Sequence, residues 1–182
     1  MVWLQLFLLN VVVFFFEMAA PNLTGYLALV PANALAMPWT FVTSIFLHAN
    51  AMHLVFNMFA LLVFAPLLEY KVGSNRFLQI YFLSGILGNT AFFLVNYGSP
   101  VAGLGASGAI YGVLGALAVL EPNLIVFVGF VPMTMWLAAL FWVAAEFLSL
   151  GRADQISHSV HLVGIFVGMF YASSLRKRFR EF

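Results

Sequence analysis

The chain of 182 residues is 64% hydrophobic and only 7% charged, with a formal net charge of +1. A soluble domain of this length needs far more charge to cover its surface, so the composition indicates one domain, residues 1–182, integral to a membrane. The small net charge argues against a nucleic acid partner, and the absence of cysteine excludes disulfides and thiolate chemistry.

Apolar segments follow one another along the chain, and a helix needs about 20 mostly apolar residues to cross roughly 30 Å of hydrocarbon. The first segment has no basic residues before it, so it resembles a span more than a cleaved signal peptide. Pro132 marks a kink or a late start in the fifth. The sequence predicts an all-α bundle of six spans, at approximately 2–20, 41–69, 77–97, 107–120, 124–150 and 157–175.

The basic residues predict the orientation of this bundle. Six spans place both termini on one side, and six of the seven basic residues then fall on that side, with Arg152 opposite. The positive-inside rule makes the basic side cytoplasmic. The residues on that side are Lys71, Arg76, Arg176, Lys177, Arg178 and Arg180.

Four polar side chains lie at a similar depth on three predicted spans. At 1.5 Å per residue, Ser107 and His161 lie about 21 Å from the cytoplasmic ends of their spans. His53 and Asn57 lie about 24 and 18 Å from Glu69. Polar groups at this depth face the bundle interior or a water-filled cavity. For any one of them, a hydrogen bond that joins two helices is the simpler explanation, but the four together favour chemistry.

Serine becomes a nucleophile when a base lies within hydrogen-bond reach, and histidine is the usual base. Tyr111 lies four residues after Ser107 on the same helical face, where its ring can pack against an imidazole. Depth alone leaves four candidate bases open: His48, His53, His158 and His161.

Glycines on the fourth and sixth spans favour close approach of these two helices. Such an approach brings Ser107 and His161 together, although ordinary helix packing explains the same glycines and is compatible with it. They are Gly108, Gly112 and Gly115 on the fourth span, and Gly164 and Gly168 on the sixth.

Acyl transfer also needs donors aimed at the developing oxyanion. His53 and Asn57 share a helical face, and the Ser107 amide is unpaired at its helix N-terminus. No carboxylate is expected level with these groups, because Glu17 and Glu146 are placed toward the outer ends of their spans. A Ser-His dyad without a carboxylate is therefore the favoured arrangement.

Three other polar residues are interpreted as structural. His48, about 140° around the helix from His53, is expected to face elsewhere and to hold the preceding loop. Glu69 is expected to hold the turn to Gly73 by bonding nearby backbone amides. His158, near the top of the sixth span, is expected at the membrane interface.

The motifs together resemble the rhomboid family of intramembrane serine proteases, in the family's order and over nearly the whole chain. One departure is Trp39-Thr40 in the first loop, where many bacterial members have Trp-Arg. The matching motifs are His48-x4-His53-x3-Asn57, Glu69-x3-Gly73, Gly105-x-Ser107-Gly108 with Tyr111, and His161-x2-Gly164-x3-Gly168.

The resemblance implies a rhomboid-type fold in which Ser107 is the nucleophile and His161 the general base. It implies an oxyanion hole formed by His53, Asn57 and the Ser107 amide, with Tyr111 supporting the base. The expected substrates are single-span membrane proteins, cut near the outer face of the plasma membrane without a metal or cofactor. The fifth span and the loop after it are expected to act as a gate.

Three other classes of function are weighed against this one. A metal-dependent hydrolase or transporter would use His53, His158 and His161, but the sequence lacks HExxH and a carboxylate at that depth. A non-catalytic binder of membrane helices has no need of four such polar groups. A soluble lipase-like hydrolase requires glycine at Ala109 and a sheet that this composition does not supply.

Overall fold

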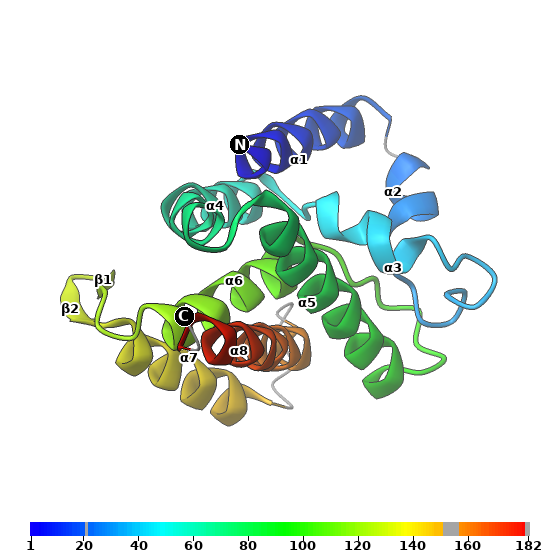
Figure 1. The fold of residues 1–182 in the computed structure, drawn as a ribbon. Coiled ribbons are helices and arrows are strands. Elements are labelled where there is room, and N and C mark those ends of the chain that lie inside the picture. Colours follow the sequence, from blue (N-terminus) through cyan, green and yellow to red (C-terminus); the bar gives the residue numbers. More distant parts are fainter. Residues whose placement is uncertain (21, 151–156, 181–182) are drawn as a thin grey trace.

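The computed structural model describes residues 1–20, 22–150 and 157–180. It is a mostly helical bundle with one small hairpin (Figure 1). Its elements are α1 (Val2–Ala19), α2 (Asn22–Leu27), α3 (Thr40–Thr43), the 3₁₀ helix η1 (Ser44–Phe46), α4 (Ala51–Val72), α5 (Ser74–Val95), α6 (Ser107–Leu120), β1 (Ile125–Val128), β2 (Val131–Thr134), α7 (Met135–Ser149) and α8 (His158–Arg180).

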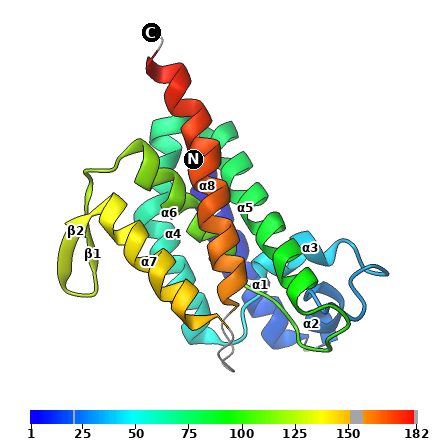
Figure 2. The same cartoon turned by 90° about the horizontal axis from the view of Figure 1, so that it is seen from below.

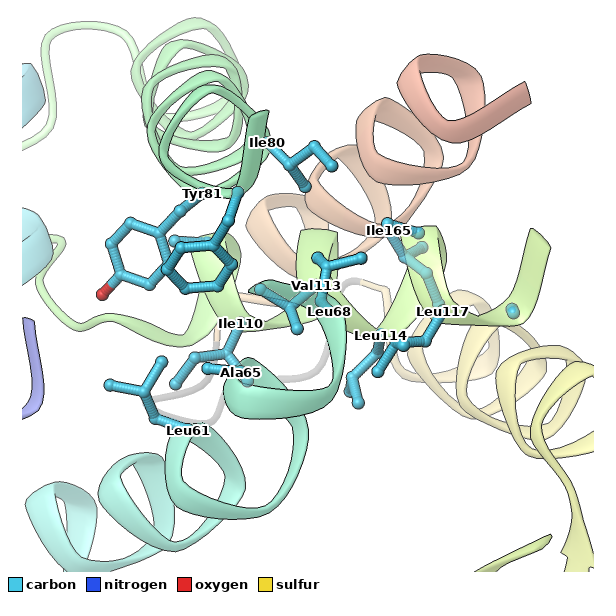
Figure 3. Close-up of a cluster of buried hydrophobic side chains, with 14 of the residues drawn as sticks. Leu61, Ala65, Leu68, Ile80, Tyr81, Ile110, Val113, Leu114, Leu117 and Ile165 are labelled. Atoms are coloured by element: carbon cyan, nitrogen blue, oxygen red, sulfur yellow. The ribbon is translucent and has the colours of Figure 1, made fainter. Parts of the chain in front are cut away.

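Helix α6 occupies the centre of the bundle, with α4, α5, α7 and α8 around it (Figure 1). Ten of its fourteen residues are buried, because its sequence is apolar or small on every face. Figure 3 shows Ile110, Val113, Leu114 and Leu117 of α6 among side chains of α4, α5 and α8. The helix that begins at Ser107 is thus fixed by packing on all sides.

Helices α6 and α8 approach each other at backbone distance. A Cβ added at Gly164 would overlap the carbonyl oxygen of Gly108, and one at Gly168 would overlap that of Gly112. Only glycine allows this approach. The predicted contact between the fourth and sixth spans is therefore present in the structure.

Within the described part of the chain, four helices are long and apolar enough to cross a membrane: α1, α4, α5 and residues 158–176 of α8. Together with the shorter apolar helices α6 and α7, they make an all-α membrane fold. The count of six spans stays a prediction. Helix α4 begins at Ala51, not near residue 41, because the Asn50 side chain accepts a hydrogen bond from the His53 amide and caps the helix there. Residues 40–46 form α3 and η1 instead.

The fifth predicted span, 124–150, is helical only from Met135. Before it, β1 and β2 pair as an antiparallel hairpin that projects from the bundle (Figure 2). β-branched residues favour the strands, and Gly129, with φ of 62°, takes the first position of the two-residue turn, where glycine is favoured. Pro132 lies in β2, so of its two readings the late helix start is correct.

The loop after α1 is held to the bundle through side chains. The indole of Trp39 donates to the carbonyl of Tyr26 (2.9 Å), and the hydroxyl of Thr43 donates to that of Leu27 (2.7 Å). Asn89 on α5 donates to the carbonyl of Phe41 (2.8 Å). These contacts anchor the first loop, although Thr40 stands here where many bacterial rhomboids have arginine after the tryptophan.

Glu69 does more than hold its turn. Its carboxylate accepts from the hydroxyl of Ser74 (2.7 Å), just past the turn, and from the amides of Val2 (3.0 Å) and Trp3 (2.8 Å). The expectation of nearby backbone amides as its partners is wrong, because the amides that it binds belong to the first turn of α1, where the helix leaves its own amides unpaired. Glu69 fastens α1 to the end of α4.

Candidate active site

The segment before α6 fixes the position of Ser107. Gly105 has a φ of 129°, which favours glycine, and its amide donates to the carbonyl of Ser44 at 2.9 Å. Gly103 pairs with Leu29 through two backbone hydrogen bonds of 2.8 and 3.0 Å. Ser107 follows as the first residue of α6 and is half-buried. Its hydroxyl is therefore held by a rigid helix start yet remains partly accessible.

His161 of α8 lies against this serine. Its Nε2 is 2.8 Å from the Ser107 Oγ, a hydrogen-bond distance, and the residue is 8% exposed. The ring of Tyr111 stacks on the imidazole with 4.3 Å between centroids and 3° between planes. The i+4 spacing predicted this stacking. Of the four candidate bases, His161 is the one in hydrogen-bond contact with Ser107.

The expectation that no carboxylate lies level with these groups is wrong. Oε1 of Glu146, on α7, lies 2.9 Å from Nδ1 of His161 and accepts from the hydroxyl of Tyr111 at 2.6 Å. Oε2 lies 2.5 Å from Nδ1 of His158. Serine, histidine and glutamate thus form a continuous chain of hydrogen bonds across α6, α8 and α7.

Sequence reasoning missed Glu146 because depth was counted from the cytoplasmic ends of the spans. Residues 125–134 of the fifth segment form the hairpin rather than helix, so that count misplaced the carboxylate. Counting from the loop between the fifth and sixth spans would have found it. Glu146 lies four residues before Leu150, and His161 lies four residues after Ser157.

His53 of α4 lies against Gly105, two residues before the serine. A Cβ at Gly105 would lie 2.8 Å from its Cε1 and 3.0 Å from its Nε2, and 3.8 Å from the Ser107 Oγ. The amide of Ala49 donates to its Nδ1 at 3.4 Å, which leaves the ring proton on Nε2 in the neutral imidazole. The Nε2–H of His53 therefore faces Gly105, in the segment just before Ser107.

Asn57 is buried one turn further along α4, and its amide donates to the carbonyl of His53 at 2.8 Å. Its second N–H is not used in that bond. The shared face of His53 and Asn57 follows from their spacing of four residues.

The expected orientation of His48 is wrong. His48 precedes α4 instead of lying on it, so its ring makes an edge contact with His53 at 5.1 Å between centroids. Its amide donates to Glu17 of α1 at 3.1 Å, which ties the loop before α4 to α1. His158, expected at the membrane interface, contacts Glu146 inside the bundle. Within the ranges that the structure describes, no three histidine, cysteine, aspartate or glutamate side chains are grouped so that they could hold a metal ion.

A family model described as the Rhomboid domain matches residues 35–178, most of the chain. The chain belongs to the rhomboid family. The assignment made from the motifs is thus confirmed. The matched region of this rhomboid holds Ser107, His161, His53 and Asn57, and also Glu146.

Several curated relatives share this region. The rhomboid is 36% identical over 142 residues to the rhomboid protease GluP of Bacillus subtilis, which covers 75% of this chain and 26% of that protein. It is 34% identical over 133 residues to RHOMBOID-like protein 6, mitochondrial, of Arabidopsis thaliana, a match that covers 71% of this chain and 41% of that protein. It is 26% identical over 146 residues to the rhomboid protease GlpG of Haemophilus influenzae, and this match covers 79% of this chain and 74% of that protein. The chain therefore spans less than half the length of the first two relatives.

Proposed function

We propose that this rhomboid is an intramembrane serine protease that hydrolyses peptide bonds in or near the transmembrane segments of membrane-anchored proteins. The relatives named rhomboid proteases support the class of reaction. The observation that carries the proposal is the 2.8 Å contact between the Ser107 Oγ and the His161 Nε2. A half-buried serine so close to a stacked imidazole has the geometry of a nucleophile beside its base.

In this mechanism Ser107 Oγ attacks the scissile carbonyl carbon while its proton passes to Nε2 of His161. The tetrahedral intermediate collapses as His161 returns that proton to the leaving amine nitrogen, which gives an acyl-enzyme. Water then attacks the ester carbonyl while one of its protons passes to His161. When the second tetrahedral intermediate collapses, His161 returns that proton to the Ser107 Oγ and the second product leaves as a carboxylic acid, which ionises. No metal or cofactor takes part.

Three donors are available for the oxyanion. The Ser107 amide lies in the first turn of α6, where it has no helical acceptor. The second donor is the Nε2–H of His53, which faces Gly105, two residues before Ser107. The third is the N–H of Asn57 that is not used in its bond to the His53 carbonyl. Donors held before the charge develops lower the barrier without reorganisation, and loss of one such donor costs about 10²–10³ in kcat in other proteases.

Charge supports an orientation with both termini in the cytoplasm. Lys71 pairs with Glu121 (2.6 Å), and Arg76 and Arg176 lie near the same end of α5 and α8. The C-terminal end of α8 and the α2–α3 region lie at opposite ends of the molecule (Figure 2). Because the start of α6 lies away from this basic end, the serine opens toward the outer face.

The test uses purified protein in liposomes with a panel of single-span substrates, with cleavage products mapped by mass spectrometry. Ser107→Ala and His161→Ala are expected to abolish cleavage while the melting temperature is retained, and a fluorophosphonate is expected to label Ser107. Ser84→Ala is the matched control, since Ser84 is a buried serine of α5. Its activity should equal that of the wild type. Cleavage that survives in Ser107→Ala would refute the serine mechanism.

A further inference from the structure

Glu146 is a buried acid surrounded by hydrogen-bond donors. It is 9% exposed, and its two oxygens lie within 2.9 Å of three polar groups, the Tyr111 hydroxyl and the Nδ1 atoms of His158 and His161. An ionised Glu146 satisfies all three contacts as the acceptor, because a carboxylate only accepts hydrogen bonds. Such a group must be paired inside an apolar bundle, because an isolated charge there is strongly disfavoured.

The contact fixes which ring nitrogen of His161 carries a proton. Because Oε1 of Glu146 is an acceptor, Nδ1 of His161 donates to it at 2.9 Å. The neutral imidazole then has its lone pair on Nε2, the atom that lies 2.8 Å from the Ser107 Oγ. The opposite tautomer would present an N–H to the serine and could not accept its proton.

The same carboxylate also fixes the plane of the ring. Tyr111 stacks on the face of the His161 imidazole and donates to Oε1 of Glu146, the same oxygen that contacts Nδ1 at the edge of that imidazole. His158 occupies the other oxygen. Rotation of the His161 ring would therefore break its hydrogen bonds at both nitrogens.

We propose that Glu146 is a positioning residue that extends the serine–histidine pair into a Ser107–His161–Glu146 relay. This inference rests on the proposed protease function. When the bond from Oγ to the scissile carbonyl forms, the serine proton moves to Nε2 and the ring becomes an imidazolium. Its Nδ1–H stays on His161, and the adjacent carboxylate stabilises the positive charge without being protonated. The proton leaves from Nε2 to the amine product.

The first experiment compares kinetics of Glu146→Gln with those of the full-length wild type in liposomes. A glutamine presents either an oxygen without charge or an N–H that imposes the wrong tautomer, so kcat is expected to fall about 10²- to 10⁴-fold. KM is expected to stay within about threefold, because Glu146 does not touch the substrate. Glu146→Asp, which retains the charge, is expected to recover part of the loss.

Glu17→Gln is the matched control. Glu17 is also a 9% exposed glutamate in a helix, with partners on Thr24 and His48. The same substitution there measures the cost of burying an amide, and its kcat should stay within about threefold of the wild type. A loss of kcat in Glu146→Gln alone supports the relay. A rise in KM with unchanged kcat would mean that Glu146 only fastens α7, and would overturn it.

A second measurement needs no variant at Glu146. Nitrogen NMR of protein labelled in histidine distinguishes protonated from unprotonated ring nitrogens, and His161→Ala identifies the His161 signals by their loss. Protonated Nδ1 with unprotonated Nε2 is expected, and the reverse would overturn the proposal even if Glu146→Gln failed to fold. The two proposals remain separable, since cleavage by Ser107→Ala refutes the serine mechanism. An inactive Ser107→Ala beside a fully active Glu146→Gln refutes the relay alone.

Discussion

Replacing Gly164 by alanine is expected to separate His161 from Ser107 without changing either side chain. The added Cβ would overlap the carbonyl oxygen of Gly108 and lie 3.1 Å from its carbonyl carbon, whereas ordinary contacts lie at 3.4–4 Å. Helices α6 and α8 must therefore move apart, by about 1 Å to clear the oxygen. Gly108 follows Ser107 directly, and Gly164 is less than one turn from His161. The 2.8 Å contact between Oγ and Nε2 then lengthens beyond hydrogen-bond range.

A misplacement of about 1 Å costs about 10²-fold in rate, so kcat/KM of Gly164→Ala should fall to about a hundredth of the wild-type value. Overpacking should cost about 1–3 kcal/mol of stability, offset by about 1 kcal/mol from the better helix propensity of alanine. The assay is cleavage in liposomes together with thermal unfolding in detergent. Gly25→Ala is the control, because a Cβ there meets nothing within 4 Å. A Gly164→Ala variant whose kcat/KM lies within twofold of the wild-type value would refute the reasoning.

Three further results are expected. Glu69→Ala leaves the amides of Val2 and Trp3 without their acceptor and should cost about 1–3 kcal/mol, seen as a lower melting temperature; an unchanged value would contradict the role given to this contact. Asn50→Ala removes the cap of α4 and should cost about 1 kcal/mol in the same measurement, with no loss meaning that the cap is dispensable. Tyr111→Phe keeps the stacked ring but loses the hydrogen bond to Glu146, so kcat should fall about fivefold, and wild-type kinetics would argue against that bond.

The central features of the site were predictable because they follow from helix geometry. Ser107 and His161 stand at equal distances from the ends of their spans, and glycines mark the faces through which α6 and α8 meet. The spacing of four residues places Tyr111 under Ser107 on one face. The depth of a residue along a helix and the face on which it lies both follow from counting residues, so they can be predicted from the sequence.

The features that were missed depend on where a helix begins or on contacts between distant segments. The hairpin before Met135 shortens α7, and this shift placed Glu146 wrongly. His48 was assigned a face of a helix that starts only at Ala51. Glu69 bonds amides of α1, which are 66 and 67 residues away in sequence. No periodic pattern reports such partners, because they are set by tertiary packing.

The attachment of α7 has a consequence for the proposed catalysis. Among the fifteen residues of this helix, Met135, Ala138 and Ala139 are buried near its start, and Glu146 is the only buried residue in its second half. Lipid gives no hydrophobic drive to hold the remaining apolar side chains against the bundle. The second half of α7 is thus held through the same carboxylate that orients His161 in the proposed relay. In the proposed protease, a substrate that parted α7 from α8 would draw Glu146 away from His161, and cleavage would wait until the two helices had closed again.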